Sequence, residues 1–458
     1  MANIRRLLFT SICLFLLSFI ISCSSDSPQP PNEDLFFQSP EWAVNANIYK
    51  VNIRQYSEEG TFKAFTEDLP RLQEMGVNIL WLMPVIPIGE ENRKGTLGNL
   101  YSVKNYTEIN PEFGSKADFR GLIEEAQSLR MWVIMDLPAG YTSPDAVWTE
   151  TNPGFYVTDE DGNYLSPGDD QQDVIQLDSE NRELWNAMIE AMEYWVSEYN
   201  IDGFHAADAR LMPVEFWVTA RDQLENIKPL FMLADAEDPE LHRAFDMTYA
   251  VDYSRTIKNI ATGQSTLSNL GAVMDQYLEN FHKRNFRMLY KTNHDVNSLQ
   301  GSDPDLYDEN FKNFAVLTAT LWGMPLIYNG QESGLDQQLE MFDKDPIEWK
   351  DYKYQEFYST LLDLNTRNQA LFNGEIGGDY RKMPTDKDEQ IFAFKRIGHH
   401  EQVLVILNFS DSDQTFNFVD GHEGTWNDVF DGSEKEITSS NTIDANSFLL
   451  LERVYMSH

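Results

Sequence analysis

The sequence predicts an α/β protein: a (β/α)8 TIM barrel with a short loop domain inserted after its third strand and a C-terminal antiparallel β-sandwich. Three observations predict this. From Trp42 to about Asn368, short apolar segments alternate with amphipathic ones, as strand–helix units do. Between residues 141 and 178 this periodicity fails in a polar stretch rich in Gly, Pro and Asp. After about Phe372, apolar residues recur at every second position, which is typical of antiparallel strands.

Short apolar segments provide the eight strands that a closed barrel needs. They are Asn47–Ile53, Ile79–Val85, Trp132–Asp136, Gly203–Ala207, Leu230–Asp235, Met247–Val251, Met288–Thr292 and Leu326–Asn329. A doubly wound open sheet is the alternative, but no Gly-rich phosphate loop follows the first segment. No cofactor is expected. In a barrel, functional residues lie at the carboxyl ends of the strands.

Two of the intervening segments have clear helix signals. Ser115 and Asp118 match a capping box, in which each side chain bonds the backbone N–H of the other residue. Between Leu184 and Tyr199, large apolar residues recur at helical spacing. Both segments are therefore predicted to be helices that pack against the barrel.

The C-terminal part is predicted to hold five antiparallel strands. They are Gln390–Arg396, Gln402–Phe409, Gln414–Val419, Thr425–Phe430 and Ser447–Val454. The expected domains are thus a barrel at residues 41–370, with the inserted loop domain at about 141–178, and a β-sandwich at residues 371–458.

The N-terminus has the pattern of a bacterial lipoprotein. A short basic region is followed by an uncharged apolar run, Leu7–Ile21, which is short for a membrane span and normal for a signal peptide. Ile20-Ile21-Ser22-Cys23 resembles a lipobox. Residues 1–22 are therefore predicted to be a signal peptide, and residues 23–40 a linker anchored by lipidated Cys23. By analogy, Ser24 favours the outer membrane, on either the periplasmic or the cell-surface face.

Charge and cysteine content exclude several classes. The chain has 74 acidic and 35 basic side chains, a formal charge of −39, which argues against a nucleic-acid partner. The same charge argues against electrostatic docking on anionic lipid. The two cysteines, Cys13 and Cys23, lie in or beside the apolar leader, which excludes a disulfide framework. The eight histidines are scattered, and no metal site is expected.

Several separated motifs occur in the right order on the predicted strands. They are Gly76–Pro84, Pro87–Gly89, Tyr101–Tyr106, Asn110–Gly114, Thr292–Asp295 and Gly323–Glu332. Together they closely resemble the α-amylase family, glycoside hydrolase family 13, from about Tyr49 to the C-terminus. The resemblance implies a catalytic barrel that cleaves or transfers α-glucosidic bonds with retention, through a nucleophilic carboxylate, an acid/base carboxyl and a third carboxylate.

The resemblance breaks at the position of the nucleophile. The family pattern Asp-Gly-(aromatic)-Arg-x-Asp corresponds here to Asp202–Ala207 without a gap. The nucleophile position is therefore Ala207, whose methyl group cannot attack carbon. Asp208 comes one residue later, and strand alternation would point its side chain to the other face unless a bulge re-aims it. The arginine position is His205, which is a candidate substrate-binding residue by its position. It could act as a ligand or base, but an exposed histidine at a strand end without such a role is the favoured interpretation.

Other positions of the implied site also differ. The acid/base Glu corresponds to Asp235, which withdraws the carboxyl by about 1.5 Å from the hydrogen-bond reach that proton transfer needs. The histidine that holds a sugar hydroxyl corresponds to Tyr141. Gly140 replaces an asparagine that is a calcium ligand in many members, and Asn105 replaces the usual Asp before a tyrosine. We therefore predict no calcium there.

Three positions match the family: Tyr101 as the aromatic platform under the sugar, His294 and Asp295 as the pair that grips its hydroxyls. The main hypothesis is a lipoprotein that binds α-glucan, with partners in a glucan-uptake complex and with lost or strongly impaired hydrolysis. One alternative is an enzyme with a non-standard site that uses Asp235 with Asp208 or a water nucleophile. The other is an interaction protein with no sugar function.

Overall fold

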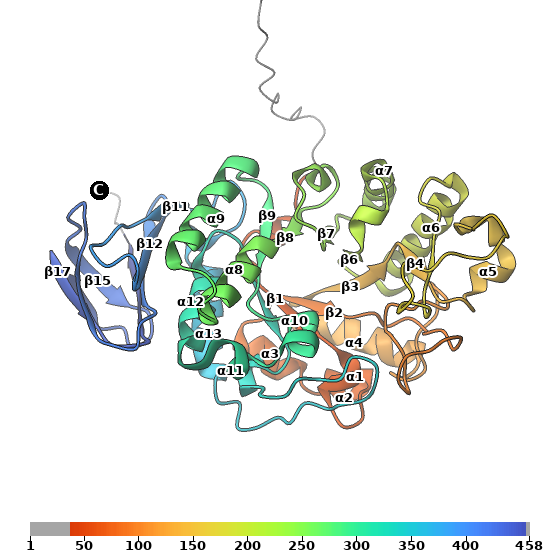
Figure 1. The fold of residues 1–458 in the computed structure, drawn as a ribbon, viewed down its shortest axis with the longest axis horizontal. Helices are drawn as coiled ribbons and strands as arrows, with labels where there is room; N and C mark the ends of the chain where they lie inside the picture. The colour runs from red at the N-terminus through yellow and green to blue at the C-terminus, as the bar shows by residue number, and fades with distance from the viewer. Residues whose placement is uncertain (1–36, 455–458) are drawn as a thin grey trace, which may run out of the picture. The chain divides into compact units, whose positions relative to one another are not determined.

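The computed structural model describes residues 37–454 (Figure 1). The expected signal peptide at residues 1–22, Cys23 and the linker up to residue 36 lie outside the described residues. Within the described part, the chain forms the predicted parallel barrel and a C-terminal domain of antiparallel sheets.

The barrel closes in the order β1–β2–β3–β6–β7–β8–β9–β10 and back to β1, and every neighbouring pair is parallel. The strands are β1 (Ile48–Val51), β2 (Ile79–Leu82), β3 (Trp132–Pro138), β6 (Gly203–Ala207), β7 (Phe231–Ala234), β8 (Met247–Tyr249), β9 (Phe286–Leu289) and β10 (Met324–Tyr328). This confirms the predicted fold class.

Helices pack outside the barrel strands (Figure 1). The α-helices are α1 (Ile53–Tyr56), α2 (Phe62–Thr66), α3 (Leu69–Met75), α4 (Lys116–Ser128), α5 (Val147–Thr151), α6 (Arg182–Tyr199), α7 (Val214–Glu225), α8 (Val251–Ala261), α9 (Leu267–Asn280), α10 (His294–Gln300), α11 (Asp303–Tyr307), α12 (Phe311–Thr320) and α13 (Gln355–Arg367). The 3₁₀ helices are η2 (Glu41–Ala43), η3 (Pro153–Phe155), η4 (Ala209–Leu211), η5 (Pro239–Arg243), η6 (Asp308–Asn310), η7 (Gln331–Ser333) and η8 (Gln369–Leu371).

Both helix predictions are confirmed. The side chains of Ser115 and Asp118 cap α4 reciprocally, as the capping box requires. Along α6, the apolar positions from Leu184 to Tyr199 are buried against the barrel. Helical spacing therefore identified the face that packs, because residues three and four apart lie on one side of a helix.

Only Gly203–Ala207 has the predicted bounds; the other seven barrel strands differ from the prediction at one end or both, and two of them begin earlier than expected. Residues 288–292 and 326–329 were expected to be strands, whereas β9 and β10 both begin two residues earlier, at Phe286 and Met324. The apolar run misplaced the end of β9 because Tyr290, although buried, already belongs to the loop after the strand. That loop leads to α10 and so carries residues to the carboxyl end of the barrel.

The amino-terminal end of the barrel is closed by apolar residues around η2. The Trp42 ring stacks on Trp132 at a centroid distance of 4.5 Å and lies 5.8 Å from Phe231. Ala43 and Ala46 are buried in the same cluster. Packing at this end leaves the opposite, carboxyl end of the strands for the site, as in other barrels.

The segment 141–178 is a βα loop with little regular structure of its own. The strands β4 (Tyr141–Thr142) and β5 (Ile175–Gln176) pair antiparallel, with α5 and η3 between them. The ring of Trp148 stacks on that of Tyr106 at 4.6 Å. This packing holds the loop beside the carboxyl end of β3, and β4 begins with a candidate site residue, Tyr141.

The C-terminal domain has a six-stranded antiparallel sheet, β11–β12–β13–β18–β15–β16, and a two-stranded one, β14–β17. The strands are β11 (Asp379–Lys382), β12 (Ile391–Ile397), β13 (Glu401–Asn408), β14 (Gln414–Asn417), β15 (Gly424–Asp428), β16 (Glu434–Ile437), β17 (Ser440–Ile443) and β18 (Phe448–Val454). The five predicted strands are confirmed, whereas β11, β16 and β17 were missed because their sequences are mostly polar.

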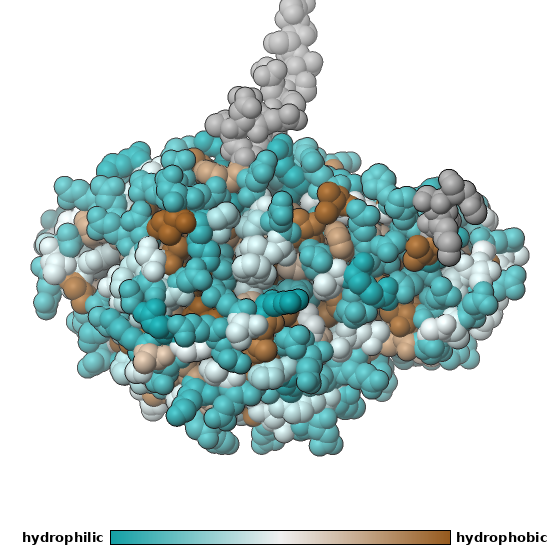
Figure 2. All heavy atoms as spheres, turned by 180° about the vertical axis from the view of Figure 1, so that it is seen from behind, coloured by the Kyte–Doolittle hydropathy of each residue, from teal (hydrophilic) through white to brown (hydrophobic). Residues whose placement is uncertain are grey.

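The surface is hydrophilic on the side that Figure 2 shows, with small and separate hydrophobic patches. Between residues 37 and 454, no helix combines the length and the apolar composition needed to cross a bilayer.

Candidate functional site

A cleft of about 570 Å³ opens at the carboxyl ends of the barrel strands. All eight site residues singled out from the sequence line it, although they come from separate segments of the chain. They are Tyr101, Tyr141, His205, Ala207, Asp208, Asp235, His294 and Asp295. The parallel barrel brings them together because the carboxyl ends of all its strands meet at one face.

A second cleft of about 490 Å³ adjoins the first, and Asp208, Asp235 and Val251 line both. Its other walls include Glu237, Asp252 and two arginines, Arg210 and Arg255. Because the two spaces share these three wall residues, they form one continuous groove.

Ala207 is the last residue of β6, and its methyl group faces the first cleft. It is 5% exposed. The position at which the resemblance implies a nucleophilic carboxylate thus lines the cleft, and it carries a side chain that cannot form a bond to carbon.

Asp208 turns into the cleft, contrary to the alternation expected for a strand. Its backbone is left-handed, with φ 57° and ψ 37°, so the strand ends here and the next side chain is re-aimed. No β-bulge is needed, because β6 ends at Ala207 and the alternation of a strand no longer applies to Asp208. Partial burial of the Asp208 carboxyl in the wall of the cleft and the nearby Asp235 carboxylate raise its pKa to about 6, although water still reaches the side chain.

Asp235 follows β7, and backbone groups hold its carboxylate. Oδ2 accepts the N–H of Asp208 at 2.7 Å, and Oδ1 accepts the N–H of Ala209 at 3.0 Å. Both oxygens are therefore turned towards the loop after β6. The carboxyl at the acid/base position cannot give a proton to a bound sugar without losing one of these bonds.

His205 is not the exposed histidine that the sequence suggested. It is 2% exposed; its Nδ1 contacts Oδ1 of Asp136, and its Nε2 lies 3.1 Å from the Tyr249 hydroxyl. Burial alone would raise the pKa of Asp136, but His205 and Lys50 hold it below its ordinary value. The expectation failed because Asp136 at the end of β3 gives the imidazole a buried partner, and nothing in the local sequence shows that pairing.

Lys50 is a site residue that sequence reasoning missed. It lies within β1 and is fully buried, with Nζ 3.0 Å from Nδ1 of His294 and 3.7 Å from the centre of the Trp81 ring. Burial lowers its pKa to about 8, against the opposite effect of Asp136 and other carboxylates. A lysine inside an otherwise apolar strand, Ile48–Val51, is the signal that could have found it.

Hydrogen bonds run in one direction from Lys50 to Asp136. Lys50 donates to Nδ1 of His294, so Nε2 carries the proton and donates to the Tyr101 hydroxyl at 3.1 Å; this tautomer is assigned from the partners. The Tyr101 hydroxyl donates to Oδ2 of Asp136 at 3.1 Å. Burial and Lys50 lower the pKa of His294 to about 4, which keeps the ring neutral as this direction requires.

The floor of the cleft is therefore an ordered polar network with a buried cation at one end and a buried anion at the other. Above it, the Asp295 side chain is exposed, with Oδ1 3.4 Å from Nε2 of His294. Tyr141 and Asp208 line the walls. Such an arrangement can accept and donate hydrogen bonds to a ligand that carries many hydroxyl groups.

Gly140 shows why the family asparagine has no room here. A Cβ atom at this position would lie 2.2 Å from Cδ1 and 3.0 Å from Cβ of Leu211. Asn105 is used locally, because its Oδ1 accepts the N–H and the hydroxyl of Thr107. Within residues 37–454, no three or more His, Cys, Asp or Glu residues come together as a metal site would need.

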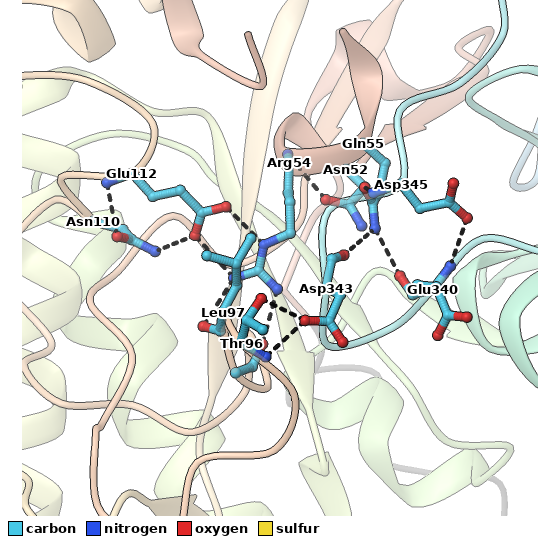
Figure 3. Close-up of polar contacts among 11 residues, drawn as sticks. Asn52, Arg54, Gln55, Thr96, Leu97, Asn110, Glu112, Glu340, Asp343 and Asp345 are labelled. Carbon is cyan, nitrogen blue, oxygen red and sulfur yellow. Dashed lines mark hydrogen bonds and ion pairs between the residues drawn. The ribbon is translucent and has the colours of Figure 1, made fainter. Parts of the chain in front are cut away.

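Side chains of α1 fix the two loops that border the cleft (Figure 3). Arg54 pairs with Glu112 at 2.8 Å and donates to the carbonyl of Gly98, which lies in the loop that leads to Tyr101. Gln55 donates to the carbonyls of Glu340 and Asp343. The loop after η7 that contributes Met341 to the cleft is thereby tied to α1.

Two sequence profiles of protein families match the chain. The α-amylase catalytic domain matches residues 45–154 and 219–388, and the α-amylase C-terminal all-beta domain matches residues 384–449. Residues 155–218 remain unmatched between the two parts of the catalytic profile. That stretch contains β6, and with it His205, Ala207 and Asp208.

Curated relatives cover most of the chain at low identity. Alpha-amylase 2 of Dictyoglomus thermophilum is 23% identical over 444 residues, which cover 87% of this chain and 74% of the relative. The α-1,4-glucan:maltose-1-phosphate maltosyltransferase of Picrophilus torridus is 25% identical over 414 residues, which cover 83% of this chain and 63% of the relative.

Solved structures share the whole architecture. A noncanonic maltogenic α-amylase from Thermotoga neapolitana superposes with a TM-score of 0.82 at 27% identity, over 90% of this chain and 99% of that one. An α-amylase from Lactobacillus plantarum gives a TM-score of 0.82 at 29% identity, over 90% of this chain and 100% of that one.

Proposed function

This chain belongs to the α-amylase family, and from that premise we propose that it binds α-glucan chains, starch or maltooligosaccharide, without hydrolysing them by the family's retaining reaction. The observation that carries the proposal is Ala207, whose methyl group lies in the cleft where the nucleophile is expected. Retention requires two carboxyl groups about 5–5.5 Å apart on either side of the sugar, one of which bonds to the anomeric carbon. At position 207 that bond cannot form.

The second carboxyl supports the same proposal. Both carboxylate oxygens of Asp235 accept hydrogen bonds from the backbone N–H groups of Asp208 and Ala209. A general acid has to reach the glycosidic oxygen within about 2.6–3.2 Å, and Asp235 is both shorter than the family glutamate and turned to the loop. The two losses are independent of each other in sequence and act on the same reaction.

The residues that would bind a glucan are retained, in contrast to those that would cleave it. Tyr101, His294 and Asp295 match the family positions that hold the sugar, and all three line the cleft. Relatives are named as α-amylases and as an α-1,4-glucan maltosyltransferase, so the family as a whole acts on α-glucans. Removal of a carboxylate at position 207 also reduces charge crowding beside a neutral sugar.

Calorimetric binding of maltoheptaose, together with reducing-end release, tests the proposal. We expect saturable binding with no turnover above the buffer rate. Turnover at the rate of an ordinary α-amylase would exclude the proposal. If no binding is seen at millimolar ligand, the remaining hypothesis is an interaction protein that has no sugar function.

A restored variant tests the assignment of positions. His205→Arg, Ala207→Asp and Asp235→Glu together are expected to gain hydrolysis. The matched control carries Ala207→Asn instead, which has the same shape and no nucleophile, and is expected to stay inactive. Circular dichroism and thermal unfolding of both variants establish that they are folded, and equal activity in the two would contradict the assignment.

A non-standard hydrolase is the second candidate, since Asp208 lines the cleft with a pKa raised to about 6 by burial and by Asp235. In that case wild-type turnover would be slow but measurable. Asp208→Asn would abolish it, whereas under the main proposal this substitution changes binding alone.

We further propose that lipidated Cys23 anchors the protein to the bacterial outer membrane, where a glucan-uptake complex would supply its partners. The support is the basic region, apolar run and lipobox of the sequence. Cys23→Ala should abolish incorporation of labelled palmitate and release the protein from the membrane fraction. Protease treatment of intact cells then distinguishes the cell-surface face from the periplasmic one.

A further inference from the structure

The turn after β6 depends on one carboxylate. Asp208 has a left-handed backbone, which costs a residue other than glycine about 1–2 kcal/mol. Two N–H groups in this turn, those of Asp208 and Ala209, bond Asp235 at 2.7 and 3.0 Å. Hydrogen bonds to a charged acceptor are roughly twice as strong as neutral ones. These two bonds to Asp235 form a clamp that offsets the free-energy cost of the left-handed turn.

The clamp leaves the Asp208 carboxyl itself available. Its side chain is exposed and borders both parts of the groove. Within residues 37–454, no hydrogen bond or ion pair to the Asp208 carboxyl is found. An acid that is oriented by its backbone and has no protein partner is suited to a ligand hydroxyl.

Several titratable groups face Asp208 across the groove. His205 lies on β6, the strand that precedes Asp208, Asp235 follows β7, and Asp295 lies at the start of α10. The hydroxyls of Tyr106 and Tyr141 are within electrostatic reach. In the adjoining cleft, Arg210 and Arg255 are wall residues. Burial and then Asp235 have the largest effects, and together they raise the pKa of Asp208 to about 6.

We infer that Asp208 is a glucan-binding residue of this groove and that Asp235 is the positioning residue that aims it, an assignment that rests on the proposed glucan binding. The role of Asp235 has thus changed, because the carboxyl at the acid/base position now builds the turn that presents its neighbour. Neither role belongs to the retaining reaction.

Glucan binding should therefore take up a proton. A sugar that covers Asp208 removes water from a carboxyl that already lies beside Asp235, and desolvation disfavours the ionised form. The neutral acid can both donate to and accept from a sugar hydroxyl. The complex then holds the proton more tightly than the free protein, so affinity is high below about pH 6 and falls as the pH rises through that value.

Calorimetry with maltoheptaose between about pH 4.5 and 8 tests the inference. We expect wild-type affinity to fall on the order of tenfold over this range, one unit of pKa difference between complex and free protein. Asp208→Asn should bind with a flat pH profile. Asp235→Asn removes the neighbouring charge, so its midpoint should move to lower pH, and the damaged clamp should weaken binding at every pH.

Asp222→Asn is the matched control, since Asp222 is exposed on α7 and lies outside both clefts. It should keep the wild-type profile. Glucan binding that is independent of pH in the wild type, or a slope that survives in Asp208→Asn, would overturn this inference and leave the proposed function intact. No glucan binding at any pH would overturn both.

Titration of the ligand-free protein provides a second readout that a merely structural role would not move. The ¹³C signal of the Asp208 carboxyl should titrate near pH 6 in the wild type and lower in Asp235→Asn. If the Asp208 carboxyl of the ligand-free wild type titrated at the ordinary pKa of an aspartate, that result would contradict the inference.

Discussion

At the scale of single residues, Asp136 is a buried carboxylate whose hydrogen-bond partners come from several barrel strands and loops. It lies at the end of β3, fully buried, and receives hydrogen bonds from Trp81 at 3.2 Å, from Tyr101 and from His205. An imidazole replaces the guanidinium that the resemblance implies at position 205. Lys50 supplies a positive charge from another strand, β1, and this charge compensates the negative charge of the buried Asp136 carboxylate.

Lys50→Met is expected to lower the free energy of unfolding by about 2 kcal/mol near neutral pH. It leaves Nδ1 of His294 without its donor and Asp136 without a nearby cation. The deficit should grow as the pH rises from about 8 towards 10.5, because the folded wild type releases the Lys50 proton before the unfolded chain does and gains stability there.

Urea denaturation at about pH 7 and about pH 9.5 measures both effects. Lys63→Met, at an exposed position of α2, is the control and should change stability little. A deficit that shrinks at the higher pH would contradict the assigned role of Lys50.

Asp208→Asn is expected to stabilise the protein at about pH 7.5 and to leave it unchanged near pH 4. The pKa of Asp208 is raised to about 6 in the fold by burial and by Asp235, above about 3.9 in an unfolded chain. The stability it contributes is therefore present below about 3.9 and is lost as the pH rises through about 6. The amide of the Asp208→Asn variant does not ionise, so the variant does not lose this stability as the pH rises.

Thermal unfolding at the two pH values checks this expectation, with Asp222→Asn as the control that should show no such gain. An equal gain at both pH values would mean that the effect comes from packing and not from the charge.

At the scale of elements, two turns compete for one space. The loop after β3 contains Gly140, and the 3₁₀ helix after β6, η4, ends at Leu211, which occupies the space of a larger side chain at position 140. Leu211 in the turn after β6 thus favours a residue without a side chain at position 140, in the loop after β3.

Gly140→Asn should destabilise the protein by about 1–3 kcal/mol, because its Cβ would overlap Leu211. Leu211→Ala in the same chain should recover part of that loss. Chemical denaturation of the two single variants and the double variant gives the coupling energy. Strictly additive effects would show that the two positions do not compete for one space.

Local sequence predicted most elements, and the failures share a cause. The barrel strands are buried on both faces, so their apolar runs are visible in the sequence. Of the missed strands, β11 has no buried residue, β16 has one and β17 has two. Their pairing is decided by neighbouring strands, which no local pattern reports.

At the scale of the whole molecule, buried polar contacts join the barrel to the C-terminal sheets. Arg396 on β12 is fully buried and donates to the carbonyls of Thr320 at 3.2 Å and Leu321 at 2.6 Å, at the end of α12. It also bonds the carbonyl of Gly378 at 3.3 Å. Asn313 donates to the carbonyl of Asn408 at 2.7 Å. The two parts are therefore expected to unfold together.

Arg396→Met should lower the free energy of unfolding by about 3 kcal/mol, because it leaves several buried carbonyl groups without a donor. Differential scanning calorimetry measures the loss and shows whether one transition becomes two. Arg381→Met, on the exposed face of β11, is the control. Equal losses in the two variants would contradict the role given to Arg396 at this interface.

The sequence by itself determined the barrel and the family and singled out the positions that depart from the family pattern, because periodicity and motif order are local properties of a chain. The tertiary structure decided what those positions do. Asp208 faces the cleft through one backbone angle, Asp235 is engaged by a turn on the neighbouring strand, and Lys50 meets His294 across the barrel. Such contacts join residues far apart in sequence, and only the closed barrel brings them within hydrogen-bond reach.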